Sequence, residues 1–274
     1  MVLEAQRADY LMDTRGTDSP PVQNTPSALP AGPVPGSAIF IKEPSTLECA
    51  LPFRKTVGKS NAKREQGILK DSVFLIRHGE MNHVISENYS YKTETYYSIL
   101  CHELEGKPVR PSSSAILDAY IVPLCLERAK RGGIPACDWG ISQGYVPLPA
   151  ILYGLNYFAT TSDFFVVDDN AKAKGVIKHI TNIGKYPFCY QKLDEGATIH
   201  SCIGIFGKTA NPCTRISQMA EKVYEQFSIP LVTMVFVKSG EQYMLSSLAP
   251  TKYSQLSGEE RTLLSAYLTH QEFL

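Results

Sequence analysis

The residues best suited to binding chemistry gather between Asn88 and Arg110. Tyrosine hydroxyl groups and asparagine amides form directional hydrogen bonds, and an arginine guanidinium can hold a carboxylate through two parallel N–H groups. This combination predicts a site for an anionic, amino-acid-like or peptide molecule. The predicted substrate-binding residues are Asn88, Tyr89, Tyr91, Lys92, Tyr97, Arg110 and Lys208. In the alternative interpretation, most of the tyrosines belong to the core and only their hydroxyl groups reach the surface.

Two helices are predicted to position this stretch. Thr93 can cap the first helix, and Ser113 or Ser114 can cap the second, because their hydroxyl groups accept hydrogen bonds from free backbone N–H groups. The turn between the helices carries Lys107 and Arg110. A helix N-terminus beside cations is a suitable place for a carboxylate or phosphate. The alternative is a pair of core helices joined by a solvated basic turn.

A second hypothesis is an independent transferase or hydrolase that uses a nucleophilic side chain. The candidate catalytic residues are His78, Cys101, Cys202 and Cys213. A thiolate nucleophile needs a lowered pKa and a neighbouring base. Cys101 and His102 are adjacent, so on a helix their side chains point about 100° apart and do not pair.

The segment Arg77-His78-Gly79-Glu80 directly follows an apolar strand pattern. It resembles the strand-then-RHGE signature of histidine phosphatases, in which the histidine becomes phosphorylated and the arginine binds the phosphate. A neutral histidine is nucleophilic near pH 7. That family also needs a second histidine after a late strand, and the nearest match, His200, lacks the usual following glycine. The alternative is a strand end with an exposed polar turn.

Neither a cofactor nor a metal is predicted. Gly58-Lys59-Ser60 lacks the earlier glycine of a phosphate-binding loop, because Phe53 occupies that position. Asp168 and Asp169 follow a buried strand pattern and could bind Mg²⁺, and the alternative is that they form a turn.

Composition narrows the class of protein. The chain has 274 residues, of which 43% are hydrophobic and 20% charged, with a formal net charge of +0. The hydrophobic and charged fractions are typical of a soluble globular protein. The net charge gives no overall positive electrostatic potential that would favour binding to nucleic acid or an anionic membrane. No apolar run approaches the roughly 20 residues of a membrane span. Seven cysteines without a CxxC pair predict reduced thiols, and therefore a cytoplasmic protein.

The predicted domain organisation is a disordered, proline-rich tail over residues 1–37 and a single α+β domain over residues 38–274. The tail could instead become ordered against a partner or a second protomer. Within the domain, hydrophobic periodicity predicts a strand at 198–206, a helix from Thr214 to Phe227 and a hairpin about Ser239-Gly240. A capping box at 257–260 opens a last helix. The expected fold is a mixed sheet flanked by helices.

Several runs in this chain resemble the N-terminal domain found before RimK-like ATP-grasp ligases. They are Asn88-Tyr89-Ser90-Tyr91, Tyr96-Tyr97-Ser98-Ile99-Leu100, the turn from Glu105 to Ser112, Ile205-Phe206-Gly207-Lys208-Thr209 and Ile229-Pro230-Leu231. Together they bracket residues 73–271. The resemblance implies an α+β domain associated with ATP-dependent amide ligation of amino acids or peptides. In that family the ATP-grasp module would begin beyond Leu274, so its nucleotide and metal residues are not expected in this chain.

The leading hypothesis is therefore a stand-alone accessory or substrate-handling relative of that domain. It would bind an amino-acid-like or peptide molecule, or dock on a separate ATP-grasp ligase. The sequence leaves open whether the protein is itself an enzyme. A regulatory interaction protein that uses its tail for recognition is the third hypothesis, and a homo-oligomer is compatible with it.

Overall fold

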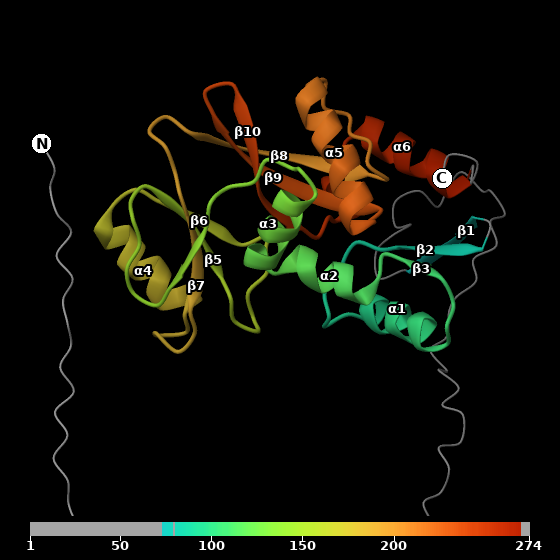
Figure 1. Ribbon diagram of the computed structural model, residues 1–274, viewed down its shortest axis with the longest axis horizontal. Helices are drawn as coiled ribbons and strands as arrows, with labels where there is room; N and C mark the ends of the chain where they lie inside the picture. The colour runs from blue at the N-terminus through green and yellow to red at the C-terminus, as the bar shows by residue number, and fades with distance from the viewer. Residues whose placement is uncertain (1–72, 79, 270–274) are drawn as a thin grey trace, which may run out of the picture. The chain divides into compact units, whose positions relative to one another are not determined.

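The computed structural model describes residues 73–78 and 80–269 (Figure 1). The predicted tail and the segment 58–60 lie outside the described residues. The first sheet has the order β1-β2-β3, in which β1 and β2 are antiparallel and β3 runs parallel to β2. Its strands are β1 (Phe74–His78), β2 (Met81–Ile85) and β3 (Val109–Arg110).

One helix precedes β3 in the chain, and two helices follow it. They are α1 (Glu94–Leu104), α2 (Ser113–Tyr120) and α3 (Val122–Arg131). Thr93 caps α1 as predicted, since its side chain accepts a hydrogen bond from the N–H of Tyr96. The predicted cap of the second helix is wrong by one or two positions: Ser112 Oγ accepts from the N–H of Ala115 at 3.1 Å. Pro123 lies in the first turn of α3, where its missing N–H leaves no helical hydrogen bond unmade.

The second sheet has four antiparallel strands in the order β4-β7-β5-β6. They are β4 (Gly140–Ser142), β5 (Ala150–Gly154), β6 (Phe164–Val167) and β7 (Phe188–Lys192). Helix α4 (Asn170–Ile180) follows β6. Strands β4 and β5 lie in a segment rich in proline and glycine, and they are defined by their pairing with β7.

The third sheet has the order β10-β9-β8 and is antiparallel throughout. Its strands are β8 (Thr198–Ile205), β9 (Leu231–Ser239) and β10 (Gln242–Ala249). The predicted hairpin is thus confirmed. Helix α5 (Thr214–Phe227) connects β8 to β9, and the 3₁₀ turn η2 (Tyr253–Gln255) and α6 (Gly258–Thr269) follow β10. The capping box is also confirmed, with Glu260 Oε2 accepting from the N–H of Ser257 at 2.7 Å.

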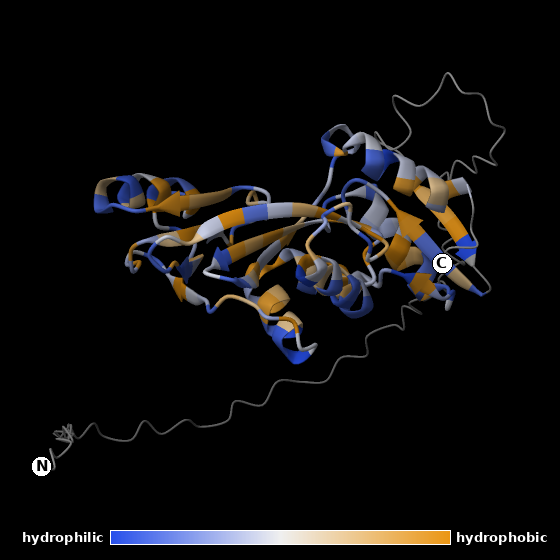
Figure 2. Cartoon of the chain, turned by 90° about the horizontal axis from the view of Figure 1, so that it is seen from above, coloured by the Kyte–Doolittle hydropathy of each residue, from blue (hydrophilic) through white to orange (hydrophobic). Residues whose placement is uncertain are grey.

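The α+β class is confirmed, with the strands divided among three sheets. The largest core cluster joins α2, α3 and α5 to β9 and β10, a second involves α6, and a third lies between α4 and the β5–β7 strands. Apolar and polar residues alternate along the elements in Figure 2, as expected for helices and strands that bury one face. No helix among the described residues is long and apolar enough to span a bilayer.

Candidate functional site

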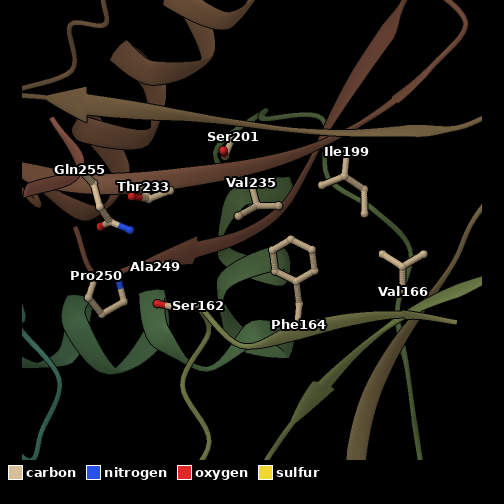
Figure 3. A pocket seen from close by; sticks show the side chains of 10 residues that line it. All are labelled: Ser162, Phe164, Val166, Ile199, Ser201, Thr233, Val235, Ala249, Pro250 and Gln255. Atoms are coloured by element: carbon tan, nitrogen blue, oxygen red, sulfur yellow. The ribbon is translucent and has the colours of Figure 1, made fainter. Parts of the chain in front are cut away.

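A pocket of about 460 Å³ lies between β6 and one face of the β8–β9–β10 sheet (Figure 3). Pockets of this size hold small organic molecules or a few residues of a peptide. The lining residues are Ser162, Phe164, Val166, Ile199, Ser201, Thr233, Val235, Ala249, Pro250 and Gln255.

Strand register explains why these residues share one face. Ser201 lies opposite Val235, and Thr233 lies opposite Ala249. Alternate side chains of a strand point to the same side of its sheet, so Ile199 joins Ser201 on the floor of the pocket. Across from this floor, the ring of Phe164 points toward Val235 (Figure 3).

The two ends of the pocket differ in chemistry. Ser162, Thr233 and Gln255 lie at one end, whereas Val166 and Ile199 lie at the other (Figure 3). The polar end offers hydroxyl and amide groups, which both donate and accept hydrogen bonds. None of the lining residues is charged. A carboxylate or phosphate bound deep in this pocket would lose hydration without gaining a countercharge, so the lining favours an uncharged group.

A buried polar network joins β5 and β7 of the second sheet to β10. The hydroxyl of Tyr153 contacts Ser246 Oγ at 2.7 Å and Ser247 Oγ at 3.1 Å. Gln191 accepts from Ser246 Oγ at 2.6 Å and donates to the Ser246 carbonyl at 2.8 Å. A register shift in β10 between Leu245 and Ser247 turns these serines toward the second sheet. The sheets are therefore held at a defined spacing.

Tyr89, one of the predicted binding residues, belongs to the core. Its side chain is 0% exposed, and its hydroxyl accepts from the N–H of Ser86 at 2.9 Å and donates to the Val84 carbonyl at 3.2 Å. Burial raises the pKa of Tyr89 well above its usual value. The alternative interpretation of the tyrosines holds at this position.

Two other predicted residues, Tyr91 and Lys92, lie together at the protein surface. Lys92 Nζ lies 4.2 Å from the ring centroid of Tyr157, and the rings of Tyr91 and Tyr157 meet edge to face at 5.8 Å. Phe158 contacts Tyr157 at 5.4 Å between ring centroids and is 75% exposed. We call Tyr91, Lys92, Tyr157 and Phe158 the aromatic surface. Tyr97, 51% exposed, stacks edge to face on its neighbour in the sequence.

Asn88 has a local structural role. Its Oδ1 accepts from the N–H of Ser90 at 2.9 Å, and its carbonyl accepts from Thr93 Oγ1 at 3.3 Å. The side chain therefore orders the turn that leads into α1.

Arg110 and Lys208 each interact electrostatically with a residue of α5. Lys208 Nζ forms an ion pair with Glu221 at 2.7 Å, and the carboxylate raises the pKa of Lys208. Burial raises the pKa of Tyr224 to about 12, and the positive charge of Arg110 limits that rise. Glu221 and Tyr224 are one helical turn apart. None of the seven predicted residues lines the pocket of Figure 3.

The basic turn before α2 already has internal anions. Glu103 Oε1 accepts from the N–H of Ser113 at 2.9 Å, and Glu103 Oε2 accepts from Ser113 Oγ at 2.5 Å. Lys107 pairs with Glu105 at 2.5 Å. The helix N-terminus that could hold a ligand carboxylate is therefore occupied by a carboxylate of this chain.

Two of the three thiol candidates are poorly suited to act as nucleophiles. Cys101 is disulfide-bonded, so the expectation of reduced thiols is wrong at this position. Burial raises the pKa of the Cys202 thiol to about 12, which leaves it protonated near neutral pH and weakly nucleophilic. Cys213 is a free, half-buried thiol at the start of α5. The side chain of His78 lies outside the described residues.

The paired acids after β6 form a helix start. Asp169 caps α4 by accepting from the N–H of Lys172 at 2.8 Å, and Asp168 pairs with Lys172 Nζ at 3.3 Å. Within residues 73–78 and 80–269, no three His, Cys, Asp or Glu side chains gather as a metal site would require.

Residues 174–267, from α4 to α6, match the family model of the RimK-like ATP-grasp N-terminal domain. The predicted resemblance is confirmed over this range. Similar solved structures include a RimK domain ATP-grasp protein from Sphaerobacter thermophilus, with 14% identity, 65% of this chain and 77% of that chain covered, and a TM-score of 0.48. D-alanine–D-alanine ligase from Helicobacter pylori has 14% identity, coverages of 63% and 65%, and a TM-score of 0.47. ATP-grasp ligase PsnB, complexed with a minimal precursor, has 12% identity, coverages of 73% and 86%, and a TM-score of 0.45. No curated protein matches the chain significantly.

Proposed function

We propose that this protein handles an amino-acid-like or peptide substrate for ATP-dependent amide ligation, and that it holds an uncharged part of that substrate in the pocket between β6 and the β8–β9–β10 sheet. The observation that carries the proposal is the neutral lining of this pocket, which is polar at one end and apolar at the other. The family match supports it, because the lining residues from Ile199 to Gln255 lie within the matched range 174–267.

The lining chemistry suits a peptide group with an apolar side chain. Thr233 shares a hydrogen bond of 2.8 Å with Thr251, so its hydroxyl is oriented before a ligand arrives. An amide N–H or C=O would replace its water contacts with hydroxyl and amide groups at the polar end. An aliphatic side chain would contact Phe164 and Ile199, where burial is favourable by about 25 cal/mol per Å².

The charged groups outside the pocket have a separate role in this proposal. Arg110 and Lys208 would meet carboxylates of the substrate or of a ligase surface, as their side chains are exposed beside α5. Arg110 forms no ion pair with any described residue, so its guanidinium remains able to bind a carboxylate through two N–H groups.

Binding of N-acetyl-valine-methylamide to the full chain, followed by calorimetry, tests the pocket. Ser201→Phe fills the pocket from β8, and we expect it to weaken binding at least about tenfold. His200→Phe is the matched control, because it adds a similar ring to the same strand on the opposite face. Wild-type affinity in Ser201→Phe would contradict the assignment.

Docking on a separate ATP-grasp ligase is a second candidate, supported by the aromatic surface. Exposed aromatic side chains are enriched at protein interfaces, and Tyr157 and Phe158 are 57% and 75% exposed. Phe158→Ser should abolish co-purification with an ATP-grasp ligase from the native cell. Tyr145→Ser is the control, since Tyr145 is equally exposed at 75% and lies on the β4–β5 connection. Equal co-purification by both variants would exclude this surface.

A further inference from the structure

Strand β8 forms an outer edge of the third sheet. The opposite edge, β10, is covered by the segment after α3: the N–H of Cys137 donates to the Leu245 carbonyl at 2.9 Å, and the N–H of Leu245 donates to the Pro135 carbonyl at 2.8 Å. At β8, by contrast, the outer edge has a backbone partner only at Ile205, within the described ranges. Among the residues that the structure describes, one edge of this sheet is therefore paired, and most of the other edge has no backbone partner.

The register shows which backbone groups point outward from β8. Ile205 exchanges two hydrogen bonds with Lys208, at 2.8 and 2.9 Å, on the side away from β9. The N–H of Phe206 donates to the Pro230 carbonyl at 2.8 Å, on the side of β9. Backbone direction alternates along a strand, so the N–H and C=O groups of Ile199 and Ser201 also point outward. No described residue bonds to these four groups.

This part of β8 lacks the usual features that protect an edge. Natural edge strands are blocked by lysine, proline or a bulge, because unpaired backbone groups attract other strands. From Thr198 to Cys202 the sequence has none of these, and its pairing with β9 is regular. Thr198, His200 and Ser201 are exposed, so an approaching chain can reach this edge.

We propose that β8 binds an extended peptide segment by strand addition, through the outward N–H and C=O groups of Ile199 and Ser201. An extended backbone is the ligand whose donors and acceptors repeat with the spacing of a strand. The side chains of Ile199 and Ser201 line the pocket, so alternate side chains of the added strand would lie beside its opening. This inference deepens the proposed function, on which it depends for the role of the pocket, by making the substrate an extended peptide.

Amide hydrogen exchange by NMR on the full chain tests the proposal. The probe is a blocked heptapeptide of alternating threonine and valine. It is used at about 1 mM, so that binding with a dissociation constant as weak as this is detected. We expect the amides of Ile199 and Ser201 to exchange at least about tenfold more slowly with peptide. The exchange rate falls exponentially with the free energy needed to open the hydrogen bond that protects an amide. The amides of His200 and Cys202, which pair with β9, should be protected with or without peptide. Unchanged exchange at Ile199 and Ser201 would overturn the proposal.

Two controls isolate the backbone contribution. Ser201→Pro removes one outward N–H and no bond to β9, and it should abolish the protection at Ile199, whereas Ser201→Ala should keep it. The same peptide with alternate amides N-methylated should give no protection on the unaltered protein, which keeps the test valid if the proline variant fails to fold. Protection by the methylated peptide would contradict strand addition.

The outcomes separate this inference from the proposed function. Binding of N-acetyl-valine-methylamide without heptapeptide protection would overturn strand addition and leave the pocket assignment intact. Heptapeptide protection without binding of the small amide would support strand addition and contradict the pocket assignment. Protection that rises with protein concentration in the absence of peptide would assign the edge to a second copy of this chain, and would also overturn the proposal.

Discussion

Replacing Tyr153 by phenylalanine tests whether the buried network holds the second sheet against β10. The variant keeps the aromatic ring, which lies 6.0 Å from the ring of Phe164 between centroids, and removes only the hydroxyl. That hydroxyl contacts Ser246 Oγ and Ser247 Oγ, and both serines are 0% exposed. Water cannot replace the lost partner without a cavity, because the site is closed.

The expected magnitude follows from the group that loses its partner. A buried polar group without a hydrogen bond costs about 1–3 kcal/mol, so Tyr153→Phe should lower the free energy of unfolding by about 2 kcal/mol. Ser247→Ala removes the other partner, and the double variant should be less destabilised than the sum of the single ones by about 1 kcal/mol. Urea unfolding followed by circular dichroism measures these differences in the free energy of unfolding, provided that its dependence on urea concentration is the same in every variant.

The matched control is Tyr190→Phe in β7. Its hydroxyl has no hydrogen bond to any residue that the structure describes, so the change should stay within about 0.5 kcal/mol. If Tyr153→Phe also changed stability by less than that, or if its effect simply added to that of Ser247→Ala, the network would not be what fixes the sheet spacing.

Two further predictions concern local features. Glu103→Ala should destabilise the protein by about 1 kcal/mol in urea unfolding, because it removes the carboxylate that caps Ser113 at the start of α2; unchanged stability would contradict this. Cys202 should resist iodoacetamide in the native state at pH 8, since burial raises its thiol pKa to about 12, and should react rapidly in denaturant. The same pKa shift makes stability depend on pH. The contribution of the protonated Cys202 thiol to the free energy of unfolding is fully present below the unfolded pKa of about 8.5, and it is lost as the pH rises toward the folded pKa of about 12. Equal alkylation rates in both states would refute the burial argument.

The sequence predicted the elements whose signals are local. Helix α5 and the β9–β10 hairpin were found because hydrophobic periodicity and a Ser-Gly turn specify them within a few residues. The capping box at Ser257 is equally local. Strands β4 and β5 were missed because they are short and interrupted by turn residues, and their pairing with β7 bridges distant parts of the chain.

The site was harder to predict because it depends on which strands face each other. Ser201 and Val235 share a face through the register of β8 and β9, which no spacing in the sequence reveals. Tyr89 and Tyr91 are two positions apart in one loop, yet the first is 0% and the second 39% exposed. Periodicity assigns no inner face to a loop, so residue type alone could not separate a core tyrosine from a surface one. The alternation of side chains along β8 is enough to place Ile199 and Ser201 on one face of the sheet. It identifies them as pocket residues only when β6 is known to lie opposite that face.

In the proposed function, the pocket between β6 and the β8–β9–β10 sheet receives an uncharged peptide group. Methyl NMR during titration with N-acetyl-valine-methylamide tests it most directly. We predict saturable shifts at the methyl groups of Ile199 and Val235, and none at Val232, which points to the other face of β9. Shifts confined to the surroundings of Arg110 and Lys208, with Ile199 and Val235 unchanged, would contradict the claim.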